Sequence, residues 1–199
     1  MHISEGVLRP EILIGGAVVA SAVTAYALYR LKSESIPTVS AFSALFFLAS
    51  FVHVPIGVTS AHLILSGLVG AILGLEAFVA IGVALLFQGV LFAFGGITTL
   101  GINLCVLATP ALIARAIFVC KAPNKAAQNA QWFLTGFVPI AFGAFLLSAV
   151  LALNGEGFYA AAKLAFVAHI PVMIIEGIIT MLALNFIRKV RPQLLEIKV

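Results

Sequence analysis

The first two residues, Met1 and His2, have the types and spacing that suit a transition metal. A free amine on Met1, the backbone amide nitrogen of His2 and its imidazole Nδ1 can close two fused chelate rings on one ion. Three nitrogens in a plane leave a fourth position open, and square-planar nitrogen coordination favours Ni²⁺ or Cu²⁺ and can accommodate Co²⁺. Histidine at position 2 also arises by chance, so the pattern indicates which chemistry is available rather than a function.

His62 is a candidate for the fourth ligand. It ends the stretch Pro55-Ile-Gly-Val-Thr-Ser-Ala-His62, in which Pro and Gly interrupt a helical pattern. We expect Thr59 or Ser60 to cap a new helix, which would hold His62 two or three residues inside it. A rigid ligand and an incidental histidine at the membrane interface both fit this pattern. His53, earlier in the same stretch, is interpreted as a structural partner of the loop.

His169 and Glu176 are the other ionisable residues within an apolar segment that could carry chemistry. At this spacing they share one helix face about 10 Å apart, so each is expected to contact a buried partner on a neighbouring helix. They could instead form the relay of an ion-coupled secondary transporter. A membrane-embedded metal-dependent hydrolase is a further alternative, but it needs an acid or base beside an open metal position, and the outer half offers only Glu5 and Glu11.

The composition requires that these residues be positioned by membrane helices. Hydrophobic residues make up 63% of the chain, charged residues make up 9%, and the mean hydropathy is +1.21. Soluble domains are roughly 45–50% apolar and about 25% charged, so a soluble globular protein is excluded. The net charge of +4 does not indicate nucleic-acid binding, because the basic residues lie at the ends of apolar spans.

We expect an all-α integral membrane bundle of about seven transmembrane helices that forms one domain over residues 1–199. Residues 1–10 precede the first span and are expected to be a retained metal-binding segment rather than a cleaved signal, because they lack a basic start. The predicted spans are Ile12–Tyr29, Thr38–Val54, Ser60–Leu75, Ala77–Phe94, Leu100–Val119, Trp132–Leu153 and Phe158–Phe186.

Basic residues set the expected orientation. They follow the first span, the fifth span and the last span, whereas the links after the second and fourth spans have none. Positive residues mark the cytoplasmic side, which predicts an outside N-terminus and a cytoplasmic C-terminus in a multi-pass protein of the cell inner membrane. Arg9 and Lys163 are isolated exceptions.

Four stretches resemble one family of transport proteins. They are Met1-His-Ile-Ser-Glu-Gly-Val-Leu8, His53-Val-Pro-Ile-Gly-Val-Thr-Ser-Ala-His-Leu63, Phe94-Gly-Gly-Ile-Thr-Thr-Leu-Gly-Ile-Asn103 and His169-Ile-Pro-Val-Met-Ile-Ile-Glu-Gly177. The sequence resembles the CbiM/NikM family, the substrate-binding membrane component of energy-coupling-factor transporters for cobalt and nickel. That family adds one N-terminal helix to a six-helix component, which agrees with seven spans.

The resemblance implies a transporter subunit rather than an enzyme. It implies metal ligation by Met1, His2 and His62. Residues expected around these ligands are His53, Glu5, Thr59, Ser60 and Asn103. No cofactor is implied beyond the transported Ni²⁺ or Co²⁺.

The resemblance also implies which partners the chain has. They are a transmembrane coupling subunit and a pair of cytoplasmic ABC ATPases. The resemblance also allows a small accessory membrane subunit as a further partner. The sequence has no G-x-x-x-x-G-K loop, so ATP would be bound by those ATPases. The lipid bilayer is the other expected partner, and nucleic acid is not.

One departure from the family concerns selectivity. Val106 stands where the family usually has a second Asn, which could alter the choice of metal. Nickel and cobalt bind the same nitrogens, so the sequence does not distinguish them, and a link to cobalamin synthesis is equally compatible.

Overall fold

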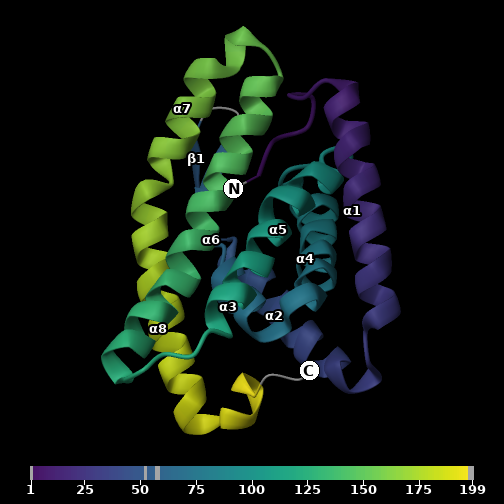
Figure 1. The fold of residues 1–199 in the computed structure, drawn as a ribbon. Helices are drawn as coiled ribbons and strands as arrows, with labels where there is room; N and C mark the ends of the chain where they lie inside the picture. Colours follow the sequence, from purple (N-terminus) through teal and green to yellow (C-terminus); the bar gives the residue numbers. More distant parts are fainter. Residues whose placement is uncertain (1, 52, 57–58, 197–199) are drawn as a thin grey trace.

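A computed structural model describes residues 2–51, 53–56 and 59–196, with only the backbone for residues 53–56 and 59–62. The chain forms a helical bundle with one short β-hairpin inside it (Figure 1). The principal elements are α1 (Pro10–Arg30), α2 (Ile36–Ala49), β1 (His53–Ile56), β2 (Thr59–His62), α3 (Ser66–Leu73), α4 (Ala77–Phe92), α5 (Leu100–Phe118), α6 (Lys125–Leu153), α7 (Tyr159–Ala168) and α8 (Ile170–Val190).

The apolar helices confirm an all-α membrane bundle. Five helical segments of the described chain are long and apolar enough to cross a membrane, namely Pro10–Arg30, Ser66–Phe92, Leu100–Phe118, Lys125–Leu153 and Glu156–Val190. A sixth apolar segment, Ser33–Ala49, is shorter. The predicted number of seven crossings therefore stays a prediction, as does the direction in which the termini face.

The β-hairpin corrects the second and third predicted spans. α2 ends at Ala49, and β1 pairs antiparallel with β2, with His53 opposite His62. The expected helix start at Thr59 or Ser60 is therefore wrong, and α3 begins only at Ser66. Extended backbone suits β-branched residues, and cross-strand hydrogen bonds satisfy the polar groups of a non-helical segment.

The other boundaries differ for local reasons. α6 begins seven residues before the predicted Trp132, because the Asn124 side chain caps it by accepting a hydrogen bond from the Ala127 N–H. The predicted last span is divided at His169 into α7 and α8, where Pro171 occupies the first turn of α8. The remaining predicted helices agree with the structure to within two residues.

Glycine contacts bring α3 close to its neighbours. A Cβ on Gly70 would lie 2.1 Å from the carbonyl oxygen of Ala111 on α5. A Cβ on Gly67 would lie 2.6 Å from the Cα of Gly136 on α6. Small residues allow this backbone approach between membrane helices. The short helix α3 is consequently fixed at the centre of the bundle.

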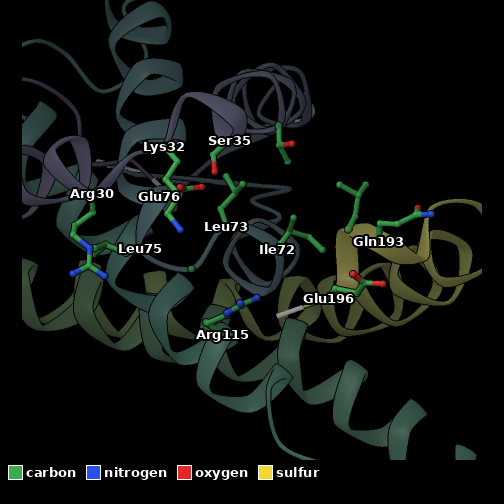
Figure 2. A pocket seen from close by; sticks show the side chains of 13 residues that line it. Arg30, Lys32, Ser35, Ile72, Leu73, Leu75, Glu76, Arg115, Gln193 and Glu196 are labelled. Carbon is green, nitrogen blue, oxygen red and sulfur yellow. The ribbon is translucent and has the colours of Figure 1, made fainter. Parts of the chain in front are cut away.

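One end of the bundle gathers basic side chains around a cavity of about 470 Å³ (Figure 2). Arg30 ends α1, Lys32 follows shortly after it, Arg115 comes from the last turn of α5, and Gln193 comes from the segment after α8. The acidic residues Glu76 and Glu196 line the same cavity. The sequence predicted that these charged ends share one side of the membrane. The structure brings them together, and the identity of that side as cytoplasmic remains a prediction.

Candidate metal centre

His2 lies buried in the N-terminal segment, with 5% of its surface exposed. The next residue, Ile3, donates its N–H to Oδ1 of Asn103 at 2.8 Å. The Asn103 side-chain nitrogen donates in turn to the Ile3 carbonyl oxygen at 3.1 Å and to Thr99 Oγ1 at 3.2 Å. Asn103 on α5 therefore holds both backbone groups of the residue that follows His2.

The loop between α4 and α5 covers this N-terminal segment. Gly95 and Gly96 have φ angles of +79° and +129°, which favour glycine. A Cβ on Gly95 would lie 2.8 Å from the Asn103 side-chain nitrogen, and a Cβ on Gly96 would lie 2.7 Å from a carboxylate oxygen of Glu5. Glu5 also accepts a hydrogen bond from the Thr98 N–H at 3.3 Å. Of the predicted residues, Glu5 thus lies in the same segment as His2, and Asn103 contacts that segment from α5.

A second asparagine, which the sequence did not single out, holds the other end of this segment. Asn154 Oδ1 accepts the Arg9 N–H, and its side-chain nitrogen donates to the Val7 carbonyl oxygen, both at 2.8 Å. The Arg9 guanidinium donates to the Leu153 carbonyl oxygen at 2.5 Å. A cation at the C-terminal end of a helix is favourable, which explains this isolated arginine. In the sequence, Asn154-Gly155 indicates only a helix end.

The remaining predicted residues belong to the β-hairpin. Thr59, Ser60 and His62 lie on β2, and His53 lies on β1 opposite His62. Both strands pack against α7. Met1 and the side chains of the hairpin lie outside the described residues, so the structure fixes the backbone position of His62 and not its ligation.

The two ends of the β-hairpin are anchored by buried polar side chains. Before the hairpin, Ser50 Oγ accepts a hydrogen bond from Gln88 Nε2 of α4 at 2.7 Å. After it, one carboxylate oxygen of Glu176 on α8 accepts the Ile64 N–H and, at 2.8 Å, the Leu65 N–H. Glu176 is fully buried. The hairpin that carries His62 is thereby connected to both α4 and α8.

Glu176 and His169 only partly match their predicted contacts. Glu176 has the expected buried partners on another segment. His169 does not, because its Nδ1 lies 2.6 Å from the carbonyl oxygen of Ala165, one turn earlier on α7. The prediction of a partner on a neighbouring helix is therefore wrong for His169, since the chain breaks there and brings the ring over the last turn of α7.

Among the described residues, no group of three or more His, Cys, Asp or Glu side chains could hold a metal ion.

The sequence matches the family described as the cobalt uptake substrate-specific transmembrane region, CbiM, over residues 2–194. The chain belongs to the CbiM family. A putative metal transport protein from Haemophilus influenzae is 41% identical over 98% of this chain and 97% of its own length. A putative fused nickel transport protein, NikMN, from Archaeoglobus fulgidus is 30% identical over all of this chain and 69% of its own length.

The fold is also shared with solved proteins. The crystal structure of a truncated transition metal transporter superposes with a TM-score of 0.82, covering 95% of this chain and 99% of that one at 24% identity. The family match and the curated relatives make this CbiM-family chain a multi-pass membrane protein for metal transport, and they support a transporter over the hydrolase alternative.

Proposed function

We propose that this chain is the metal-binding subunit of an energy-coupling-factor transporter that imports Ni²⁺ or Co²⁺. The metal is held by the Met1 amine, the amide nitrogen and imidazole of His2, and the imidazole of His62. Four nitrogens in a plane form a site that suits Ni²⁺, and Co²⁺ can use the same donors.

The observation that carries this proposal is the fixed backbone at the start of the chain. A chelate built on residues 1 and 2 uses backbone atoms, so it requires a defined backbone rather than a cluster of acidic side chains. Asn103 holds Ile3 on both its N–H and its carbonyl oxygen, and His2 is buried beside Gly95. A burial of this kind is unusual for the polar end of a chain and supports a role for His2.

The rest of the transporter is proposed to be supplied by other subunits. The chain has no phosphate-binding loop, so a pair of cytoplasmic ABC ATPases and a transmembrane coupling subunit are needed to use ATP. The basic end of the bundle, which the charge pattern assigns to the cytoplasm, is the end where such subunits would act.

The ion-coupled alternative is less well supported by the contacts of its two residues. Glu176 accepts hydrogen bonds from backbone N–H groups, and His169 Nδ1 lies beside the Ala165 carbonyl oxygen. Each residue therefore has its own structural contact, and neither contact connects the two residues as a relay. Metal affinity of the purified protein separates the two functions, because a proton- or sodium-driven transporter with this relay needs no transition metal.

Two variants test the ligand set. His2→Ala removes the imidazole of the proposed N-terminal chelate and should abolish tight Ni²⁺ binding in the purified protein. His62→Ala should remove most of the bound metal while the protein remains folded, and His53→Ala should cause a smaller loss. Intact-mass spectrometry of the wild type must first establish that Met1 is present and unmodified.

The absorption spectrum of the Ni²⁺-loaded protein gives the decisive readout. A planar four-nitrogen site is low-spin and yellow, whereas an octahedral, oxygen-rich site is paramagnetic and pale green. Wild-type metal content in His2→Ala, or a six-coordinate spectrum in the wild type, would overturn the proposed ligands.

A further inference from the structure

We propose that Glu176 is the positioning residue of the metal site, and that it fixes the β-hairpin so that His62 can complete the coordination. This inference rests on the proposed function, because it assigns a role relative to His62. Glu176 lies on α8 and does not need to touch the metal to act in this way.

The position of the Glu176 contacts is the first argument. Its carboxylate oxygen accepts the N–H groups of Ile64 and Leu65, which are two and three residues after His62. All of these atoms are buried within the bundle: Ile64 is 1% exposed and Leu65 is 4% exposed. Two hydrogen bonds from adjacent amides to one oxygen fix both the position and the direction of the backbone as it leaves β2.

The conformation of Leu65 is the second argument. Its φ angle of +57° lies in the left-handed region, which residues other than glycine seldom adopt. Such a conformation persists only where the surroundings enforce it. The Glu176 carboxylate is the described group that binds the Leu65 N–H, so it stabilises the sharp change from strand to helix at this residue.

The short helix α3 provides a matched comparison, because polar side chains hold it at both ends. Glu176 accepts the N–H groups at its start, and the Arg115 guanidinium donates to the Ala71 carbonyl oxygen near its end at 2.6 Å. Each side chain therefore satisfies backbone groups that the helix itself leaves without a partner at that end. Of these two residues only Glu176 is adjacent to the hairpin, since Ala71 lies six residues after Leu65, about 9 Å further along α3.

The contacts at the two ends of α3 allow an effect on ligand position to be distinguished from an effect on general stability. Removal of either side chain weakens the hold on α3 and should lower thermal stability. Removal of Glu176 should also release the hairpin exit, which shifts His62 away from the metal. Residues that orient metal ligands typically contribute roughly 10- to 100-fold to affinity.

The experiment compares Glu176→Ala, Glu176→Gln and Arg115→Gln in the purified full chain. Each variant is titrated with Ni²⁺, its thermal stability is measured, and its Ni²⁺ absorption spectrum is recorded beside that of His62→Ala. Glu176→Ala should bind Ni²⁺ about 10- to 100-fold more weakly, with a spectrum that matches His62→Ala. Glu176→Gln retains an acceptor oxygen with weaker, uncharged hydrogen bonds, so its affinity should fall only about threefold.

Arg115→Gln should be less stable than the wild type and keep both its Ni²⁺ affinity and its spectrum. The proposal is wrong if Glu176→Ala retains wild-type affinity, or if Arg115→Gln loses affinity to the same extent. Should Glu176→Ala not fold, Glu176→Gln decides the question: unchanged affinity and spectrum reject the role, and a loss confined to this variant supports it. A wild-type spectrum in His62→Ala would instead reject the proposed ligand set.

Discussion

Replacing Asn103 by Ala should weaken metal binding, although Asn103 is not a proposed ligand. The substitution removes the hydrogen bond from the Ile3 N–H and the one to the Ile3 carbonyl oxygen. It also leaves Thr99 Oγ1 without its bond from Asn103. The first two bonds are the described polar contacts that hold the backbone directly after His2.

The magnitude follows from these two bonds. A neutral hydrogen bond contributes about 0.5–1.5 kcal/mol net, so two contribute about 1–3 kcal/mol to docking of the N-terminal segment. If docking is lost in the metal-free variant, the apparent Kd rises by the inverse of the docked fraction. At about 1.4 kcal/mol per factor of ten, Ni²⁺ affinity should fall by at most roughly 5- to 140-fold.

The assay is a competition titration of purified protein with Ni²⁺ and a chelator of known affinity. Asn154→Ala is the matched control, because it also removes two hydrogen bonds to the N-terminal segment but does so at Val7 and Arg9, next to α1. Its effect on affinity should be smaller, since the covalent connection to α1 keeps this end in place. Wild-type affinity in Asn103→Ala, or equal losses in both variants, would refute the reasoning.

Three further predictions use other parts of the structure. Gly70→Ala should strongly reduce the yield and melting temperature of purified protein, because its Cβ would lie 2.1 Å from a backbone oxygen of α5. Gly96→Ala should lower the metal content, because its Cβ would collide with Glu5 and its φ of +129° disfavours a side chain; unchanged metal content would contradict this. Ni²⁺ affinity should fall as pH decreases from 8 to 6, because the imidazoles and the amine must be unprotonated to bind the metal; a flat titration series would argue against nitrogen ligands.

The helices were predictable where an apolar run has clear ends. α4 and α5 agree with the prediction to within two residues, because the Gly95-Gly96 loop separates two continuous apolar stretches. The β-hairpin was missed because Val54, Ile56 and Ala61 are apolar and extend the hydropathy of α2 and α3. Hydropathy measures transfer into the membrane and does not distinguish a helix from extended backbone that is buried in protein.

The candidate site was predictable for the residues that have distinctive chemistry. His2 and Asn103 were identified from the sequence, and the structure brings them together through Ile3. Asn154 and the contacts of Glu176 were not predictable, because each depends on a backbone partner more than 100 residues away. Backbone N–H and C=O groups occur in nearly every residue, so the sequence of the partner segment does not indicate which of its residues will make the contact.

The two asparagines that hold the N-terminal segment also set the order in which the site can form during synthesis. The ribosome makes residues 1–10 first, whereas Asn103 follows Ile3 by 100 residues and Asn154 follows Val7 by 147. At about 5–20 residues per second, the segment must wait roughly 7–30 s for its second anchor. A nascent chain therefore lacks the second anchor of its N-terminal segment until α6 has been made, although that segment is made well before both asparagines.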